Sequence, residues 1–369
     1  MDAGFIARNA VRIAARGELA FEFDRIPLVA TGIRGRKLTN LVRIAGNRLL
    51  PIATAQGYPY MAHVSPANVC NVHCERCPAH DPATAARTFL PFDIYEKFMD
   101  GAAPYLLYAI LWSWGEPLLN PDIYRMIESA SRRNVLTITS SNLNHFGEDH
   151  AREMVASGLD AIIVALDGTN PETYARTRPG GTYSAVVENT RLLVEAKRRA
   201  ASSKPLINLR MVVTQENEAE VEDFKLLARE LGVDMVSFKA FSTRQAGYSD
   251  PEWDRVRAPR TSGLRWYEYE RDFRRKQARG EYDCRFPWTK PTLFPDGSIL
   301  ACEFDLGAKH AFGNLHDSSF EDIWFGEQAQ TTRRAFQRDR NSLPFCRECV
   351  YDNAVIEGCV LTWEYLDHD

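Results

Sequence analysis

The sequence contains no apolar run of the roughly 18 residues that a membrane span requires. It has no N-terminal apolar block followed by small residues, so we expect a cytoplasmic protein and not a secreted one. Charge of one sign is not in excess either: 45 basic side chains stand against 49 acidic ones in 369 residues, with an isoelectric point of about 6.1. That balance gives no reason to expect a nucleic-acid partner. The length suffices for roughly two to three domains, one of which can be a large α/β barrel.

Cysteine is missing from residues 78–283, yet the chain contains eight cysteines in all. They fall into a front group and a back group. The front group is Cys70, Cys74 and Cys77, and the back group is Cys284, Cys302, Cys346, Cys349 and Cys359. In a reducing cytosol, cysteines that cluster in this way indicate a metal site more often than disulfides.

Residues 1–57 are predicted to form an N-terminal helical segment. Within residues 1–50, nine Lys and Arg side chains outnumber four Asp and Glu. Apolar residues from Leu38 to Leu49 recur at helical spacing, with basic residues such as Lys37 between them. Such a basic amphipathic helix would suit a membrane surface or an anionic partner. We favour the alternative, in which the helix packs across the outside of the following domain.

Residues 58–245 alternate short β-rich runs with longer helical ones, which predicts an α/β fold. The strand candidates are residues 60–64, 108–112, 136–140, 161–166, 207–213 and 235–240. Each precedes a segment of helical periodicity, for example residues 121–133 and 221–231. Six such units in series predict a parallel sheet with helices outside, in the form of a partial (β/α)6 barrel. Ligands of such sheets bind at the carboxyl ends of the strands.

Residues 246–283 break this alternation and are rich in charge and in aromatic side chains such as Trp253 and Trp266. Arginine and aromatic side chains together can bind single-stranded nucleic acid. A solvated helix accounts for the same composition, and we predict a linker with one exposed helix.

Residues 284–369 are predicted to form a small C-terminal domain built from a β-hairpin and a helix. Two short β-rich runs flank the turn sequence Pro-Asp-Gly at residues 295–297, which is a strong hairpin signal. Ser318 and Glu321 have the spacing of a capping box, which predicts a helix from there to about Arg338.

The front cysteines Cys70, Cys74 and Cys77 directly follow the first predicted strand. Three thiolates in one loop of eight residues can hold three corners of a cubane iron–sulfur cluster and leave its fourth iron open for a cofactor. The alternative is a zinc site, which would need a fourth ligand such as His73 or His80. The spacing alone permits both.

The Cys-x3-Cys-x2-Cys pattern after a strand resembles the signature of the radical S-adenosylmethionine (SAM) superfamily. Further motifs that resemble those of the same family stand at the ends of the next predicted strands. They are Trp114-Gly115-Glu116-Pro117, similar to Gly-Gly-Glu-Pro, then Ser140-Ser141-Asn142, then Leu166-Asp167-Gly168. The resemblance covers about residues 58–245. Trp114 stands where the family has the first glycine of its Gly-Gly-Glu-Pro motif, so this sequence departs from the family there.

The resemblance implies S-adenosyl-L-methionine as cofactor and a SAM-binding [4Fe–4S] cluster held by the three front cysteines. It assigns the cofactor contacts to residues on the strands and at their ends. They are Gly115, Glu116, Pro117, Ser140, Asn142, Asp167 and Arg210, the last within the fifth predicted strand. The carboxylate of Glu116 would hold the methionine ammonium group by a charge-assisted hydrogen bond.

The back cysteines resemble those of the SPASM, or twitch, extension of radical SAM enzymes. Cys284 and Cys302 bracket the predicted hairpin, and Cys346 and Cys349 follow as a Cys-x2-Cys pair. Four thiolates can surround one cubane. The full SPASM form has seven cysteines and two auxiliary clusters, so this sequence resembles the shorter form with one auxiliary [4Fe–4S] cluster. A zinc knuckle is the alternative.

Two residues of the C-terminal domain are candidate catalytic residues. Glu303 directly follows Cys302, and some SPASM relatives have a catalytic acid at that place; it would accept the proton that is lost when a carbon radical is oxidised. A solvent-exposed carboxylate is the alternative. Cys359 is left over after four ligands are assigned. It can be an inert buried thiol, a ligand that replaces one of the four, or a thiol that donates hydrogen to a product radical.

The resemblance implies an oxidoreductase that receives electrons from a flavodoxin or ferredoxin, cleaves SAM to a 5′-deoxyadenosyl radical and removes hydrogen from a substrate carbon. We expect it to dehydrogenate a sugar, an aminocyclitol or a similar small molecule. Epimerisation with Cys359 as hydrogen donor is one alternative, and maturation of a ribosomal peptide is another. Peptide-modifying relatives often have an N-terminal peptide-binding domain of helices and a β-hairpin, and residues 1–57 look helical and too short for one. From a different class, a zinc protein that binds nucleic acid would also contain two cysteine groups.

Overall fold

The computed structural model describes residues 3–49, 54–80, 88–241, 256–265, 267–269, 276–278, 284–347 and 360–366. Its centre is a sheet with six parallel strands in chain order. They are β3 (Met61–Val64), β4 (Tyr108–Leu111), β5 (Leu136–Ser141), β6 (Ala161–Ala165), β7 (Leu206–Val213) and β8 (Met235–Ala240). Each of these strands lies within one residue of the bounds that the sequence predicts.

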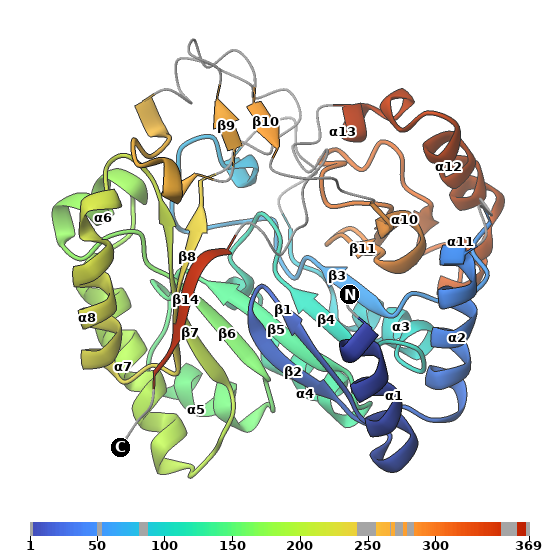
Figure 1. Ribbon diagram of the computed structural model, residues 1–369, viewed down its shortest axis with the longest axis horizontal. Helices are drawn as coiled ribbons and strands as arrows, with labels where there is room; N and C mark the ends of the chain where they lie inside the picture. The colour runs from blue at the N-terminus through green and yellow to red at the C-terminus, as the bar shows by residue number, and fades with distance from the viewer. Residues whose placement is uncertain are drawn as a thin grey trace.

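Four further strands extend this row at its two edges (Figure 1). They are β11 (Thr292–Leu293), β12 (Ser298–Leu300), β13 (Gly313–Asn314) and β14 (Val360–Tyr365). β11 is parallel to β3, whereas β14 is antiparallel to β8. The strand order is therefore β13-β12-β11-β3-β4-β5-β6-β7-β8-β14, an open row and not a closed barrel. The predicted partial (β/α)6 barrel is confirmed, and its sheet continues without a break into the predicted C-terminal domain.

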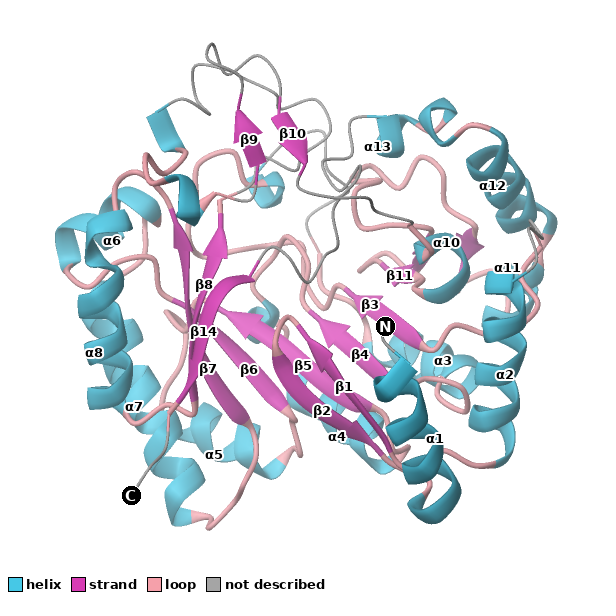
Figure 2. Cartoon of the chain, viewed as in Figure 1, coloured by secondary structure: helices cyan, strands magenta, loops and turns pink. Residues whose placement is uncertain are grey.

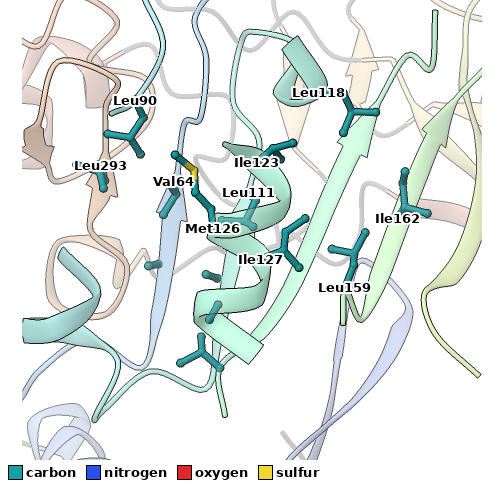
Figure 3. Close-up of a cluster of buried hydrophobic side chains, with 14 of the residues drawn as sticks. Val64, Leu90, Leu111, Leu118, Ile123, Met126, Ile127, Leu159, Ile162 and Leu293 are labelled. Atoms are coloured by element: carbon teal, nitrogen blue, oxygen red, sulfur yellow. The ribbon is translucent and has the colours of Figure 1, made fainter. Parts of the chain in front are cut away.

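Helices cover one face of the parallel strands (Figure 2). They are α3 (Phe92–Ala102), α4 (Ile123–Arg132), α5 (Glu148–Ala156), α6 (Pro171–Thr177), α7 (Tyr183–Arg199) and α8 (Val221–Leu231). Figure 3 shows how Ile123, Met126 and Ile127 of α4 project toward the strands that carry Val64 and Leu111. This packing of apolar helix faces on alternate strand residues forms the main hydrophobic core.

The opposite face of the sheet, here called the inner face, is partly covered by the N-terminal segment (Figure 1). This segment contains α1 (Ala3–Arg16), β1 (Leu19–Phe23), β2 (Ile26–Ala30) and α2 (Gly35–Leu49). Strands β1 and β2 form an antiparallel hairpin. Phe21 and Phe23 contact the ring of Tyr108 on β4, with ring centroids 5.1 and 5.8 Å apart. The hairpin thereby closes a second hydrophobic cluster against the inner face.

The prediction that residues 1–57 are helical is wrong for residues 19–30, which form the hairpin. Alternate residues of β2 are buried, which is the period of a strand and not of a helix. Asp24 and Arg25 both have positive φ angles, 50° and 67°, as the central residues of a two-residue hairpin turn require. Each strand is only five residues long, so the alternation of buried and exposed residues repeats only twice and gives a weak signal in the sequence.

Helix α2 packs on the following domain, as the favoured alternative predicts, and contacts the segments that lead into β3 and β5. Asn40 Nδ2 donates to the carbonyl oxygen of Tyr58 at 2.9 Å, and the Tyr58 N–H donates to Asn40 Oδ1 at 2.8 Å. Nζ of Lys37 donates to the carbonyl oxygen of Asn134 at 2.6 Å, whereas the apolar Val42 is 65% exposed. None of the helices in the described residues has the length and apolar character needed to cross a bilayer.

The C-terminal domain consists of short helices around the β11–β12 hairpin, which forms as predicted. The helices are α10 (Phe286–Thr289), α11 (Phe320–Phe325), α12 (Glu327–Arg338) and α13 (Pro344–Arg347). The helix-capping residue is Ser319, which accepts from the Asp322 N–H, and not Ser318 as predicted. The predicted single helix is also interrupted at Gly326, where the backbone is extended and a Cβ would lie 2.4 Å from the Asp322 carbonyl oxygen.

Within the predicted linker, the described residues form a small antiparallel pair, β9 (Tyr267–Tyr269) and β10 (Lys276–Ala278). These residues are strands and not part of the exposed helix that the sequence predicts. Trp253 and Trp266 lie outside the described part of the chain. Short 3-10 helices complete the fold. They are η1 (Pro78–His80), η2 (Pro117–Leu119), η3 (Glu218–Glu220), η4 (Ser262–Leu264) and η5 (Arg340–Ser342).

Candidate functional site

The loop of residues 70–77 follows β3 and carries the three front cysteines. Sγ of Cys77 lies 3.7 Å from the carbonyl oxygen of Trp114, which comes after β4. Nδ2 of Asn142, which comes after β5, lies 3.7 Å from Sγ of Cys70. Burial raises the pKa of the Cys70 thiol to about 12 and that of Cys77 to about 11. The segments after three neighbouring strands therefore meet at one cysteine loop.

The histidines considered as zinc ligands, His73 and His80, stack on each other with ring centroids 4.4 Å apart. Nε2 of His80 lies 2.6 Å from the carbonyl oxygen of Val72, so a hydrogen bond occupies that nitrogen. Among the residues described, no three Cys, His, Asp or Glu side chains are grouped to hold a single metal ion. Three half-buried thiols spread over one loop fit three corners of a cubane cluster.

Gly115 and Glu116 pack against the chain that leads into the cysteine loop. A Cβ on Gly115 would lie 2.2 Å from the carbonyl oxygen of Ala67, so only glycine fits at this position. The Glu116 N–H donates to the carbonyl oxygen of Val69 at 2.8 Å. Pro117 then begins η2. The Gly-Glu-Pro motif thus fixes the segment after β4 against the residues just before the cysteine loop.

The carboxylate of Glu116 is buried and accepts two main-chain hydrogen bonds. Oε1 accepts from the Leu118 N–H at 3.1 Å, and Oε2 accepts from the Asn142 N–H at 2.9 Å. Burial raises the pKa of Glu116, and the two hydrogen bonds oppose that shift. Because each carboxylate oxygen has a further lone pair, Glu116 can still accept from an ammonium group. The predicted ammonium ligand therefore also ties the ends of β4 and β5 together.

The motif at the end of β5 contains two predicted cofactor contacts, Ser140 and Asn142, which lie in different places. Nδ2 of Asn142 donates to Oδ1 of Asn71 inside the cysteine loop at 2.9 Å. Ser140 pairs in register with Ile163, whose side chain belongs to the hydrophobic cluster of the inner face. Paired residues of neighbouring strands share a face, so Ser140 faces the inner side of the sheet. The structure thus brings Asn142 to the cysteines and sets Ser140 on the inner face.

Asp167 binds an arginine that has no recognised motif of its own in the sequence. Oδ2 of Asp167 accepts from Nε of Arg178 at 2.7 Å, and Oδ1 accepts from the Val212 N–H at 2.8 Å. Burial would lower the pKa of Arg178, but Asp167 and the Cys74 thiol together hold it above its ordinary value. Arg178 is therefore a fixed cation beside the front cysteines, and Asp167 orients it.

Arg178 reaches the cysteines because the turn that follows it packs on their loop. The carbonyl oxygen of Pro179 accepts from the His73 N–H at 2.7 Å. Gly180 has a φ of +87°, and a Cβ there would lie 3.2 Å from Nδ1 of His73. The pair of glycines at residues 180–181 is the sequence signal that could have indicated this close approach.

Arg210 lies on the inner face and binds the turn of the N-terminal hairpin. Its Nη1 donates to Oδ2 of Asp24 at 2.7 Å, and its Nε donates to Oγ of Ser237 at 2.9 Å. The guanidinium is buried by these partners. The partner Asp24 could not be foreseen from a segment predicted to be helical. The assignment of Arg210 to the cofactor stays a prediction.

Cys302 and Glu303 follow β12, and the Glu303 carboxylate is held by two basic side chains. Oε2 of Glu303 accepts from Nζ of Lys290 at 2.9 Å, and Oε1 lies 3.6 Å from Nδ1 of His63 on β3. Burial would raise the pKa of Glu303, but Lys290 and His63 hold it well below its ordinary value. Glu303 is 8% exposed, so the alternative of a solvent-exposed carboxylate is wrong.

The other back cysteines are placed only in part. Burial, Glu303 and the nearby Cys284 raise the pKa of Cys302, so two of the four predicted ligands lie close together. Cys346 is buried in α13 at the edge of the main core. Cys349 and Cys359 lie outside the described residues.

The front and back segments lie against each other at Trp114. Its indole ring contacts the ring of Phe304, with centroids 5.7 Å apart. Trp114 also lines a small pocket together with Pro78 of the front segment and Phe294 of the β11–β12 hairpin. The residue that departs from the resembled motif thus forms part of the contact between the two cysteine-bearing segments.

Two family models match the chain. The model of the radical SAM superfamily matches residues 64–228. The SPASM model, described as an iron-sulfur cluster-binding domain, matches residues 284–350. Together the two matches span more than half of the chain and include every predicted cluster ligand.

Two similar proteins span most of the chain. The AdoMet-dependent heme synthase of Methanosarcina barkeri is 25% identical over 339 residues, which covers 81% of this chain and 92% of that protein. The PqqA peptide cyclase of Rhizobium meliloti is 23% identical over 306 residues and covers 79% of each. Among solved structures, SuiB of Streptococcus suis bound to S-adenosylmethionine has a TM-score of 0.59 at 16% identity, over 80% of this chain and 72% of that one. At this identity the structural match supports the fold.

Proposed function

Because the chain belongs to the radical SAM superfamily and carries a SPASM iron–sulfur domain, we propose that it removes a hydrogen atom from a substrate carbon and dehydrogenates it. The observation that supports dehydrogenation best is the placement of Glu303, a buried carboxylate with Oε2 3.5 Å from Sγ of Cys302. A proton acceptor and a predicted cluster ligand are therefore adjacent. Oxidation of a carbon radical needs both, because the radical must lose a proton and an electron.

The residues at the front cysteines would bind and orient the cofactor. When bound, SAM and its [4Fe–4S] cluster supply a 5′-deoxyadenosyl radical, and the auxiliary cluster accepts the electron that the substrate radical loses. Glu116 would receive the methionine ammonium, and Arg178, fixed by Asp167, would face the methionine carboxylate. An external one-electron reductant of the flavodoxin or ferredoxin type would supply the electron for each SAM cleavage.

The second half of the reaction would use the back segment. Once hydrogen has left a carbon that bears a hydroxyl group, the hydroxyl proton would pass to Glu303 and the electron to the auxiliary cluster, so that the C–O bond becomes a carbonyl. Lys290 and His63 keep Glu303 ionised, and Lys290 would have to move away from the carboxylate, or share its charge with the substrate, before Glu303 takes up the proton. The product would leave with two hydrogens fewer, one of which is found in 5′-deoxyadenosine.

We propose a sugar, an aminocyclitol or a similar small molecule as the substrate. The N-terminal segment supports this choice, because its hairpin is packed against the inner face through Phe21 and Phe23. The face of the hairpin that packs on the sheet is therefore closed to a leader peptide. Peptide modification is the second candidate, since one of the similar proteins is named a PqqA peptide cyclase.

Substrate trapping tests the substrate class. Reconstituted enzyme is incubated without oxygen with SAM, dithionite and pools of deuterated polyols or deuterated peptides, and deuterium is followed into 5′-deoxyadenosine by mass spectrometry. We expect transfer from a polyol pool, with a product two mass units lighter than its unlabelled substrate. Transfer from peptides alone would establish the second candidate instead.

Replacement of two residues separates dehydrogenation from epimerisation. Glu303→Gln should leave 5′-deoxyadenosine formation intact and slow product formation about a hundredfold or more, whereas Glu327→Gln on exposed α12 serves as the control. Cys359→Ala should be nearly silent for a dehydrogenase. An epimerase would instead incorporate deuterium from solvent through its thiol, and would lose both that label and its product in Cys359→Ala.

A further inference from the structure

The turn of the N-terminal hairpin brings one carboxylate to two cations on the inner face. Oδ2 of Asp24 lies 2.7 Å from Nη1 of Arg210 and 3.1 Å from Nζ of Lys239. The main-chain carbonyl oxygen of Asp24 also accepts from Nη2 of Arg210 at 3.1 Å. Asp24 and Arg210 are each 4% exposed, whereas 24% of the Lys239 side chain reaches solvent.

The charges of this group do not balance. Arg210 and Lys239 carry two positive charges, and Asp24 carries one negative charge. The other partners of Arg210 are neutral: its Nε donates to Oγ of Ser237, and its Nη2 donates to the side-chain oxygen of Asn208 at 3.1 Å. Among the described residues one positive charge is therefore left over at the partly buried Lys239, where an anion that joins the group would balance it.

The neighbouring arginine of the turn does not change this count. The guanidinium of Arg25 lies over the ring of Trp363, 4.5 Å from the centroid, and 3.8 Å from Glu22. The carbonyl oxygen of Arg25 accepts from the hydroxyl of Tyr365 at 2.5 Å. These contacts fix the turn against β14, and Glu22 offsets the charge of Arg25.

The group lies on the side of the sheet where a substrate would bind. Lys239 is the second-last residue of β8, and 24% of its side chain is exposed. Arg210 pairs in register with Ala165, the last residue of β6. Glu116 follows β4, four strands away, so at about 4.8 Å per strand Lys239 lies roughly 15–20 Å along the sheet from Glu116. A small molecule held at Lys239 can extend from there toward the front cysteines.

We infer that Lys239 and Arg210 form an anion subsite that holds a carboxylate or phosphate group of the substrate, so that Arg210 serves the substrate and not the cofactor to which the resemblance assigns it. The inference rests on the proposed function for the idea that a substrate enters the inner face. Asp24 orients both cations and leaves one charge for the ligand. The substrate class becomes more specific: a small molecule that bears an anionic group at one end and the reacting carbon at the other.

Thermal unfolding of the reconstituted full-length enzyme tests the subsite with simple anions. The midpoint is compared in sodium phosphate, sodium acetate and sodium chloride at equal ionic strength. Phosphate, acetate or both should raise the midpoint of the wild type by about 2–5 °C over chloride, and the two arms show which anion is preferred. Lys239→Gln should lose this rise. Lys204→Gln should keep it, because Lys204 pairs with Asp160 in the same way but lies before β7.

Removal of the internal carboxylate should act in the opposite direction. Asp24→Asn leaves two unopposed cations, so the affinity for phosphate or acetate should rise about tenfold and the midpoint shift should increase. If Asp24→Asn does not fold, the midpoint shift of Lys239→Gln still tests the anion subsite. An equal shift in wild type and Lys239→Gln, or no shift over chloride in the wild type, overturns the inference.

The outcome is separable from that of the proposed function. Cleavage of SAM by dithionite-reduced wild-type enzyme without substrate requires the front site alone, so it reports on the proposed function independently of anion binding. An enzyme that binds phosphate through Lys239 but never forms 5′-deoxyadenosine would refute the proposed function and keep the anion subsite. An enzyme that cleaves SAM but shows no Lys239-dependent anion binding would do the reverse.

Discussion

The indole N–H of Trp114 donates a hydrogen bond of 3.1 Å to the main-chain carbonyl oxygen of Glu303, 189 residues further along the chain. The carbonyl oxygen of the same Trp114 lies 3.7 Å from Sγ of Cys77. One residue therefore touches both cysteine-bearing segments. A glycine, as in the motif that this segment resembles, would keep the contact with Cys77 and lose the one with Glu303.

Trp114→Phe should keep the ring contact with Phe304 and remove the hydrogen bond to Glu303. We expect a loss of about 1 kcal/mol in the free energy of unfolding and an altered electron paramagnetic resonance spectrum of the reduced auxiliary cluster, at unchanged iron content. Trp114→Ala should increase both effects. Trp363→Phe, on the exposed edge strand β14, is the control. Identical spectra for wild type and both Trp114 variants would show that the contact only fills space.

The iron content depends on the two cysteine groups separately. Reconstituted wild type should contain about eight irons and eight sulfides per chain, from two cubanes. Replacement of Cys70, Cys74 and Cys77 by Ala should leave about four of each and abolish reductive cleavage of SAM. Replacement of Cys284 and Cys302 is the matched control and should spare the front cluster. Reductive SAM cleavage by the triple variant would refute the assignment of the front loop.

Glu116→Gln should lower the affinity for SAM about ten- to a hundredfold, because an amide cannot match the carboxylate in a charge-assisted hydrogen bond to the ammonium. The structure adds a second effect. The new amide nitrogen would face the N–H of Leu118 or Asn142, so the thermal midpoint should also fall. Glu128→Gln on the surface of α4 is the control. Isothermal titration with SAM decides the first effect; unchanged affinity would leave Glu116 as a structural residue of the turn.

The pH dependence of stability should include Lys37. Burial lowers the pKa of Lys37 from 10.5 to about 8. Below pH 8 both the folded and the unfolded chain are protonated at this side chain, and between pH 8 and 10.5 the unfolded chain binds more protons. The free energy of unfolding therefore rises with pH across that window.

Comparison with Lys37→Met isolates this contribution. The wild type should gain on the order of 1–2 kcal/mol relative to Lys37→Met between pH 7.5 and 10, measured by urea unfolding at each pH. Lys204→Met removes an exposed lysine and should run parallel to the wild type. Parallel curves for Lys37→Met as well would mean that Lys37 reaches solvent.

The barrel could be predicted because its strands repeat one strong signal. Residues such as 161–165 are continuous apolar runs, which parallel strands buried on both faces require. The motifs at the strand ends were found for the same reason, since each directly follows such a run. Gly115 could be singled out by its motif, but the Ala67 carbonyl that excludes any larger residue is visible only in the fold.

The residues that escaped prediction depend on contacts between distant segments. Arg178 reaches Cys74 because a double-glycine turn folds back on the cysteine loop, and nothing near Arg178 in the sequence encodes that approach. The sequence pattern predicts that Lys37 lies on the polar side of its helix. In the structure its amine donates to the Asn134 carbonyl oxygen and is buried. The periodicity of apolar residues describes one helix or strand at a time. It cannot predict which polar atom of another segment a side chain will bind.

The N-terminal hairpin has a consequence for the order in which the chain folds. Residues 19–30 leave the ribosome before the strands that cover them, because they pack on Tyr108 of β4 and pair with Arg210 of β7. The hydroxyl of Tyr365, near the end of the chain, binds the turn of the hairpin. The hairpin can therefore begin to pack only after β4 has been synthesised, and its turn gains its last contact only after β14 has followed. During that interval an apolar hairpin stays uncovered, and we expect it to be a preferred binding site for chaperones on the nascent chain.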